Sequence, residues 1–319
     1  GVTAGGEISV RVMLLISGTV SGLETITINP VTNSIFDALG NPALNTTSTG
    51  AVTLQSGPGP TITNVTSSTA DGAYKQGSLL SIEVTFSETV NVTGVPVLTL
   101  ETGSTDQNAT YASGSGSSTL VFQYTVQSGD TSADLDYVAT ASLGLGGRTI
   151  KNVGGVNATL ILPSPGSAGS LGGNKALVID TSAPNVTSVS SSTANGAYVA
   201  GNTILVTVIF SEAVIVTGAP TLTLETGSTD RAISYTSGSG TTTLIFTYTV
   251  QSGDFSNDLD YVSTSSLALA GGVITDAALN SAVLTLASPG ATSSLGANKS
   301  FTINSTIAIV TSVSSSIAN

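Results

Sequence analysis

Acidic side chains that recur along the chain are its main candidates for chemistry. When the sequence is aligned with itself at a shift of 124 residues, which carries Phe86 onto Phe210, carboxylates return at six matched positions. Carboxylates on loops suit Ca²⁺, which takes oxygen ligands and needs neither histidine nor cysteine. We therefore predict one candidate set of calcium ligands per copy, namely Asp130, Asp134, Asp136 and Glu88 in the first and Asp254, Asp258, Asp260 and Glu212 in the second.

The same acids also suit a purely structural role. In the motif GDxxxDLD, Asp130 is placed to cap a turn, Asp134 and Asp136 would be solvated, and Tyr137 would anchor a bend of the tyrosine-corner type. The acids do not follow the ordered ligand spacing of an EF-hand loop. The sequence leaves both interpretations open, and calcium is the one cofactor that it suggests.

The composition argues against an enzyme. The 319 residues include no Cys and no His, which removes thiolate chemistry, the commonest general base and the commonest zinc ligands. Two carboxylates could serve a glycosidase, but a site copied in every repeat of a chain without Trp is more typical of a structural feature. We therefore expect no catalytic and no cofactor-binding residues.

The charge balance limits the partners. The chain carries 19 acidic and 7 basic residues, a net charge of −12, which disfavours nucleic acid and anionic membranes. The longest apolar run near the start, residues 10–18, is too short to span a bilayer. We expect neither nucleic-acid binding nor membrane insertion.

Short apolar-alternating segments must position these side chains. Runs rich in Val, Ile and Thr, separated by Gly, Ser, Asp and Pro, are typical of β-strands, and the tyrosines keep one register in both copies, as core residues do. The sequence predicts an all-β fold of seven to nine strands per repeat with almost no helix. The clearest strands are expected at residues 79–86, 96–101, 107–113, 118–126, 158–162 and 176–180.

Two short motifs are predicted to form turns. The SGSG segments at 113–116 and 237–240 have neither the Lys nor the helix of a phosphate loop and are expected at hairpin tips. Asp71-Gly72 becomes Asn195-Gly196 in the second copy. Both pairs suit a turn with positive φ, so Asp71 is expected to serve backbone conformation rather than charge.

Several longer motifs carry a family resemblance. The segments FSEAV, TGAPTLTLETG, SGSGTTTLIFTYTVQSGD, DLDY, ITDAALN and SLGANK together resemble the bacterial immunoglobulin-like repeats, also described as cadherin-like, of very large secreted and surface proteins. The resemblance covers residues 58–305, and residues 7–57 resemble the closing strands of a related repeat. It implies tandem immunoglobulin-like antiparallel β-sandwich modules in an elongated array that is extracellular or at the cell surface.

The repeat pattern divides the chain into four parts. Residues 1–57 are expected to form the closing strands of a partial module, 58–181 and 182–305 two whole modules, and 306–319 the opening strand of a further module or a strand donated to another chain. This organisation predicts a non-catalytic stalk or filament whose partners are other copies of itself, joined end to end through 306–319. The alternative is a calcium-stiffened adhesin that binds a glycan or another cell-surface ligand.

Overall fold

The structure is a computed structural model that describes residues 25–27, 52–53 and 58–305. The predicted strand at 306–319 lies outside the described residues, as does most of the predicted partial module, of which only β1 (Thr25–Ile26) and β2 (Val52–Thr53) are described, paired antiparallel. The chain divides into two compact units, and the second contains, besides the residues from Val178 onward, the segments Gly72–Ser78 and Val126–Thr131.

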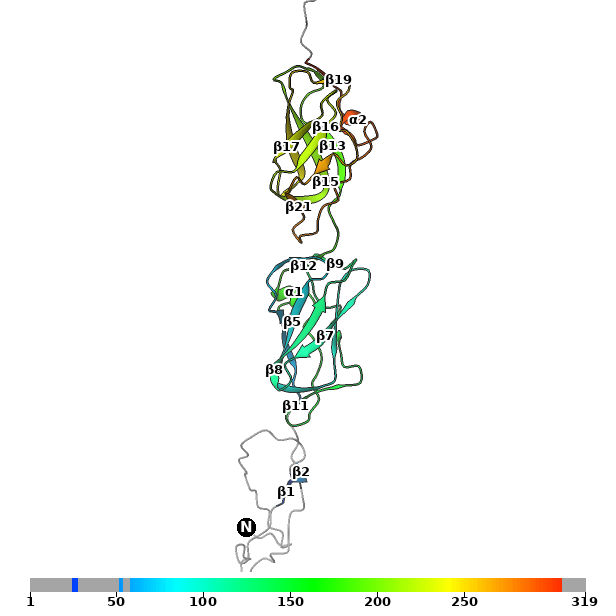
Figure 1. Ribbon diagram of the computed structural model, residues 1–319. Coiled ribbons are helices and arrows are strands. Elements are labelled where there is room, and N and C mark those ends of the chain that lie inside the picture. The colour runs from blue at the N-terminus through cyan, green and yellow to red at the C-terminus, as the bar shows by residue number, and fades with distance from the viewer. Residues whose placement is uncertain (1–24, 28–51, 54–57, 306–319) are drawn as a thin grey trace, which may run out of the picture. The chain divides into compact units, whose positions relative to one another are not determined.

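The first repeat forms one large and one small β-sheet. Its strands are β3 (Ile62–Ser67), β4 (Gly72–Tyr74), β5 (Leu79–Thr93), β6 (Val97–Leu100), β7 (Gln107–Ser113), β8 (Ser117–Thr125), β9 (Thr131–Ser132), β10 (Leu143–Gly144), β11 (Thr149–Asn152) and β12 (Leu177–Asp180). The seven-stranded sheet has the order β10-β6-β7-β8-β5-β11, with β3 also paired to β5, and the three-stranded sheet has the order β4-β12-β9 (Figure 1).

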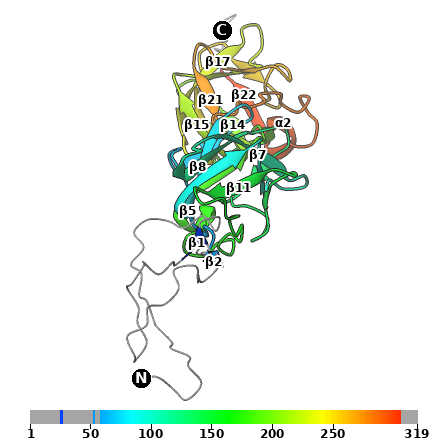
Figure 2. The same cartoon turned by 90° about the horizontal axis from the view of Figure 1, so that it is seen from below.

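The second repeat has the same strand order. Its strands are β13 (Val186–Ser191), β14 (Gly196–Tyr198), β15 (Thr203–Thr217), β16 (Thr221–Leu224), β17 (Arg231–Ser237), β18 (Thr241–Thr249), β19 (Phe255–Ser256), β20 (Leu267–Ala268), β21 (Val273–Thr275) and β22 (Phe301–Asn304). The large sheet has the order β13-β15-β18-β17-β16-β20, with β21 paired to β15, and the small sheet is β14-β22-β19. Strand pairs of the large sheet are antiparallel, whereas β14 and β22, which lie side by side in Figure 2, run parallel.

The prediction of an all-β chain is therefore confirmed. Each repeat contains ten strands rather than the seven to nine expected. The additional strands are very short ones, such as β9 and β10, each of which is two residues long. In the part of the chain that the structure describes, helix is limited to the single turns α1 (Leu171–Asn174) and α2 (Leu295–Asn298), capped by the hydroxyls of Ser170 and Ser294. Within the described ranges, the structure contains no helix of the length and apolarity needed to cross a membrane.

The longest strands, β5 and β15, hold each large sheet together. Alternate side chains of β5, including Leu80, Ile82 and Val84, are fully buried, as expected for a strand with one face on the core. The strand runs beyond the predicted 79–86 because it continues through the FSE motif. There its register with β8 shifts between Thr85 and Val90. This irregularity places Glu88, and Glu212 in β15, in the bulged segment.

Residues 158–162 are not the strand that the sequence predicts. Thr159 makes an isolated parallel bridge to Thr61, and Asn157 makes an isolated bridge to Lys151. Ile161 is 67% exposed, so the apolar run does not lie wholly on the core. Single bridges therefore hold this segment in place of a continuous ladder.

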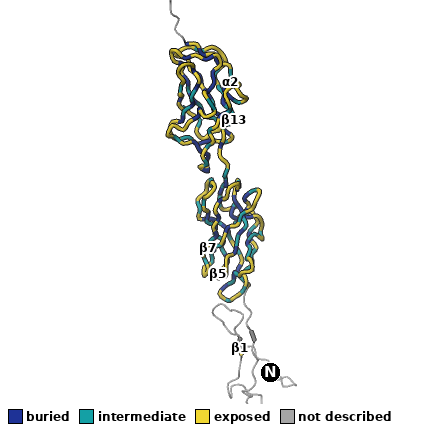
Figure 3. The backbone as a smooth tube through the Cα atoms, turned by 45° about the vertical axis from the view of Figure 1, so that its right-hand side comes forward, coloured by how far each residue is buried: buried dark blue, intermediate teal, exposed yellow. Residues whose placement is uncertain are grey.

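The aromatic register marks the core for part of the predicted set, since Tyr198 and Tyr235 are half-buried and pack against the core cluster. In the second repeat, Phe210, Phe246, Tyr248 and Tyr261 are buried in one cluster with aliphatic side chains from both sheets. The buried backbone positions alternate with exposed ones along the strands (Figure 3). Complete burial of one such side chain is worth about 1.5–3 kcal/mol, so this cluster is the main source of stability.

The predicted turns have mixed outcomes. The segment after Ser113 joins the antiparallel strands β7 and β8, which confirms the hairpin. The interpretation of Asp71 was incomplete, because its carboxylate lies 2.9 Å from Lys175 Nζ and also accepts the Ala176 N–H. Asn195 accepts the equivalent Ser300 N–H. The shared role is therefore to accept a backbone donor, and charge is added in the first repeat.

Candidate functional site

The acids of the DLDY motif are part of a tyrosine-anchored loop. Asp136 is 8% exposed, and its two carboxylate oxygens accept the N–H groups of Tyr137 and Gly166 at 2.9 Å. Tyr137 Oη donates to the carbonyl of Pro163 at 2.5 Å. The predicted tyrosine-anchored bend matches these bonds, but the expectation that Asp136 is solvated was wrong.

The second repeat builds the same loop. Asp260 accepts the N–H groups of Tyr261 and Gly290, and Tyr261 Oη donates to the Ala287 carbonyl at 2.7 Å. Burial, followed by the negative charge of Asp260, raises the pKa of Tyr261 to about 12. Both oxygens of this carboxylate are thus engaged in fixing the loop.

The neighbouring acids Asp134 and Asp258 are exposed. The carboxylates of Asp134 and Asp136 nevertheless both lie beside Gly172 in α1. A Cβ atom added at Gly172 would lie 3.4 Å from Asp134 Oδ2 and 3.1 Å from Asp136 Oδ2. This crowding explains a glycine in the α1 turn.

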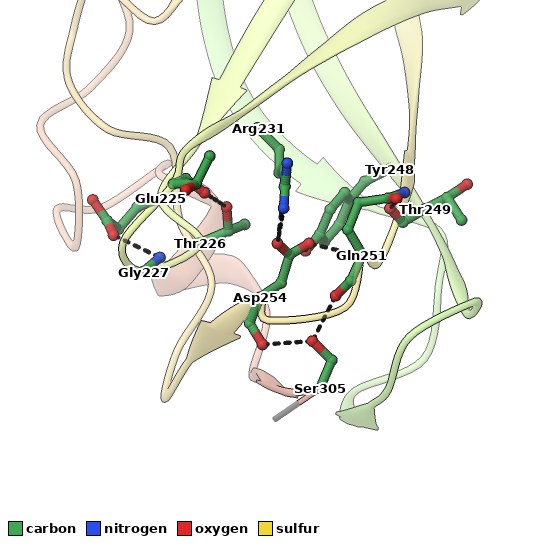
Figure 4. Close-up of polar contacts among 10 residues, drawn as sticks. Glu225, Thr226, Gly227, Arg231, Tyr248, Thr249, Gln251, Asp254 and Ser305 are labelled. Atoms are coloured by element: carbon green, nitrogen blue, oxygen red, sulfur yellow. Dashed lines mark hydrogen bonds and ion pairs between the residues drawn. The ribbon is translucent and has the colours of Figure 1, made fainter. Parts of the chain in front are cut away.

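Asp254 is the centre of a buried polar network (Figure 4). The residue is 1% exposed, and its Oδ1 accepts from Arg231 Nε at 2.8 Å and lies 2.8 Å from Arg231 Nη2. Its Oδ2 accepts from Tyr248 Oη at 2.8 Å and from the Gln251 N–H at 2.7 Å. Burial alone would raise the pKa of Asp254, but the bonds from Arg231, Gln251 and Tyr248 together hold it below its usual value.

The equivalent Asp130 caps the same turn. It is 3% exposed and accepts the Gln127 N–H at 2.7 Å, which agrees with the predicted capping role. At the position of Arg231, the first repeat has Gln107. The arginine is therefore specific to the second copy.

The bulged glutamate of the first repeat bonds to an amide. Asn152, which ends β11 and is 6% exposed, donates from Nδ2 to Glu88 Oε1 at 3.3 Å. Its Oδ1 accepts the Val156 N–H at 2.9 Å, which closes the turn that follows the strand. Glu88 thus has a neutral donor beside it.

The second repeat replaces that amide by a carboxylate. Asp276 follows β21 at the position of Asn152, and its carboxylate lies with those of Glu212 and Asp180 in a group whose ligand atoms are all within 4.8 Å of one another. Asp276 is 2% exposed and the other two side chains are half-buried. Among the described residues, no other group of three acids is this close.

Asn280 organises the three-carboxylate group. Its Nδ2 donates to Asp276 Oδ2 at 2.7 Å and to the Asp180 carbonyl at 2.9 Å, and its N–H donates to Asp276 Oδ1 at 2.8 Å. Burial, and then the charges of Asp180 and Asp276, raise the pKa of Glu212. A cation with oxygen ligands would relieve this repulsion.

The sequence predicted one member of this group and missed two. Glu212 was a candidate ligand because it recurs as Glu88, whereas Asp180 and Asp276 correspond to Ser56 and Asn152 and do not recur. The signal that was missed is the replacement of the neutral Ser56 and Asn152 by the acidic Asp180 and Asp276, two positions that lie close together in the fold. The other predicted ligands of the second repeat, Asp254, Asp258 and Asp260, are not in this group.

Comparison with known proteins does not assign the chain. No protein-family model matches the sequence, and no curated protein matches it.

Proposed function

We propose that this chain is a non-catalytic structural protein, built of tandem immunoglobulin-like β-sandwich modules and used extracellularly as a stalk or filament. The observation that carries the proposal is the use of the repeated polar residues. The recurring acids of the QSGD and DLDY motifs accept hydrogen bonds from their own loops in both copies. The acids that recur between the two copies therefore serve to hold the fold of each repeat.

The satisfied interior supports the same proposal. Among the described residues, every buried side-chain nitrogen or oxygen atom has a hydrogen-bond partner. Catalytic sites commonly keep polar groups poised for a substrate, with perturbed pKa values and open geometry. The buried acids Asp136, Asp254 and Asp260 are instead committed to backbone N–H groups, to a tyrosine and to an arginine, and the buried Asp276 is bonded to Asn280.

Imaging of the native protein on its source cells tests this function. A structural array predicts extended assemblies outside the cell, with other copies of the chain as partners. The contribution of residues 306–319 to such contacts stays a prediction, since this segment lies outside the described residues. A dispersed intracellular protein would contradict the proposal.

The second candidate function is a calcium-stiffened adhesin, and the group of Asp180, Glu212 and Asp276 favours it. Three carboxylates at this distance repel one another unless a cation or a proton neutralises them. Calcium takes six to eight oxygen ligands, which backbone carbonyls and water would complete. A glycan or other cell-surface ligand remains part of this alternative without a residue assigned to it.

The chain supplies a matched variant for the calcium test. Asp276→Asn introduces the residue that the first repeat has at this position; it removes a like charge but also one of the two oxygens that accept bonds from Asn280, so the calcium response is compared and not the melting temperature in chelator. If calcium binds here, added Ca²⁺ raises the melting temperature of the parent protein but not that of Asp276→Asn. Asp258→Asn, at an exposed acid outside the group, should keep the calcium response. An equal response in all three proteins would exclude this site.

A further inference from the structure

The turn that opens β14 contains a chemically labile dipeptide. Asn195-Gly196 is the only Asn-Gly pair among the 319 residues. The peptide nitrogen that follows an asparagine can attack the side-chain amide carbon of that asparagine, and a glycine hinders this attack least because it has no Cβ atom. Both residues are exposed, and a Cβ atom added at Gly196 would meet no atom within 4 Å. The place of attack is therefore open to water.

The hydrogen bonds of this turn act on the two reacting groups in opposite ways. Asn195 Oδ1 accepts the Ser300 N–H at 3.2 Å, which polarises the amide and stabilises the negative charge that develops on this oxygen during attack. Asn195 Nδ2, the leaving nitrogen, has no hydrogen bond to another of the described residues, so its departure breaks no bond of the fold. The Gly196 N–H donates to the Ser300 carbonyl at 3.1 Å, and this bond must open before the nitrogen attacks. The turn thus activates the amide carbon and restrains the nitrogen.

The first repeat shows the structure that the reaction product would have. Asp71-Gly72 occupies the same position, and Asp71 Oδ1 accepts the Ala176 N–H at 3.2 Å, which is the bond that the second repeat makes with an amide oxygen. The same Asp71 oxygen lies 2.9 Å from Lys175 Nζ. The bonds from Lys175 and then from the Ala176 N–H hold the pKa of Asp71 below its usual value. A carboxylate at this position is therefore charged at neutral pH.

The cation for such a carboxylate is already present in the second repeat. Lys299 corresponds to Lys175 and is likewise half-buried. Its Nζ lies 5.5 Å from the centre of the Phe301 ring, whereas the first repeat has Leu177 in place of that ring. Only the negative charge is missing from the second copy of the ion pair.

We propose that Asn195 is a deamidation site and that its conversion to aspartate supplies this charge, which pairs with Lys299. In the first step the Gly196 nitrogen loses its proton and bonds to Asn195 Cγ, the Cγ–Nδ2 bond breaks, and ammonia leaves a succinimide ring. Water then adds to the side-chain carbonyl of the ring and breaks the new carbon–nitrogen bond, which leaves a carboxylate and restores the peptide. Water is the only co-reactant, and the inference does not depend on the proposed function.

The fold selects the direction in which the ring opens. Opening at the backbone carbonyl gives isoaspartate, which adds a methylene group to the backbone directly before β14. Gly196 begins β14 and pairs with Phe301 of β22, so an added methylene would shift this register. Opening at the side-chain carbonyl keeps the register. We therefore expect aspartate from the folded chain.

Peptide mapping of the full chain by mass spectrometry tests the site. After incubation of fresh protein at mildly alkaline pH, below its melting temperature, the peptide that contains Asn195 should gain the mass of an amide converted to an acid. Asn202 is the internal control, because it is also exposed but is followed by Thr203. It should react on the order of tenfold more slowly, since a β-branched side chain crowds the attacking nitrogen. In urea the map should contain isoaspartate as well, because the pairing of β14 is lost.

The variant Asn195→Asp tests the ion pair without waiting for the reaction. The pKa of the carboxylate at position 195, read from its NMR titration, should lie below its usual value, and Lys299→Met in the same chain should raise it. Lys151→Met, at a half-buried lysine of the first repeat, is the matched control and should leave this pKa unchanged. The proposal is overturned if Asn195 in the folded chain reacts no faster than Asn202, or if isoaspartate is the main product there. It is also overturned if Lys299→Met does not change the titration.

Discussion

Arg231 allows Asp254 to remain charged in the interior of the second repeat. A buried carboxylate is costly unless ion pairing and hydrogen bonds compensate for lost hydration. In this network the guanidinium supplies two nitrogens at 2.8 Å from one oxygen, while Tyr248 and Gln251 satisfy the other. Arg231 is thus a structural residue, although an isolated Arg–Asp pair would invite a functional interpretation.

Replacing Arg231 tests this role. Arg231→Ala should lower the free energy of unfolding by about 1–3 kcal/mol, because Asp254 loses a charged partner. Asp254 has a lowered pKa in the folded state, so the stabilisation is present above its unfolded value of 3.8 and is lost as the pH falls through the folded value. Urea unfolding at pH 7 and pH 2 measures both effects. Arg148→Ala, at an exposed arginine, should change little.

The tyrosine of the DLDY motif provides a second test at this scale. Tyr261→Phe removes the bond to the Ala287 carbonyl and should cost about 1 kcal/mol at neutral pH. The raised pKa of Tyr261 means that its contribution is complete below the unfolded value of 10.0 and is lost as the pH rises towards about 12. The parent protein should therefore lose stability over this window more steeply than Tyr261→Phe. Equal slopes would contradict the assignment, and alkaline unfolding curves measure them.

The recurrence of residues between the two copies identified residues with structural roles. It did not identify the group of three carboxylates formed by Asp180, Glu212 and Asp276. Asp130 and Tyr137 were assigned plausible local roles because turn and corner motifs are local in sequence. Asp180 and Asp276 are far apart in the chain and meet only through the sheets, so no spacing rule could join them. Their difference from Ser56 and Asn152 was visible in the sequence, but its meaning required the fold.

At the scale of elements, the turn after β21 stores backbone strain. Leu279 has φ of 68°, whereas the first repeat has Gly155 there with φ of 80°. A left-handed conformation is costly for a leucine and free for a glycine. The turn is nevertheless held by the Asp276–Asn280 bonds and by Lys75 at the Leu279 carbonyl.

Relief of this strain is measurable. Leu279→Gly should raise the free energy of unfolding by about 0.5–1 kcal/mol, the cost of the left-handed leucine less the added entropy of glycine in the unfolded chain. The reverse change, Gly155→Leu, should destabilise the protein by a similar amount, since a Cβ there meets no atom within 4 Å and the left-handed backbone is strained for a leucine. Denaturation midpoints of the two variants should move in opposite directions. A destabilised Leu279→Gly would show that the leucine side chain makes a contact of greater value.

Strand prediction succeeded where pairing is local. The predicted 107–113 coincides with β7, which forms a hairpin with β8, and alternation located β5 and β6 to within a few residues at their starts. The two-residue strands β9 and β10 exist because distant segments pair with them, which alternation does not reveal. The run at 158–162 was misassigned for the converse reason, since its apolar residues lack a partner ladder.

At the scale of the whole molecule, we propose that the two repeats, each with its own buried core, bear load or span distance. The identical strand orders and the shared register of buried rings support this view. Such a protein needs each repeat to unfold as a unit, because stepwise unfolding limits the force transmitted to its neighbours.

Single-molecule force extension of residues 1–319 tests that central claim most directly. Each repeat holds 124 residues between equivalent positions, so its unfolding should release on the order of 400 Å of chain. We predict two force peaks separated by equal length increments of this size. A single peak releasing both repeats at once, or extension without any force peak, would contradict the account.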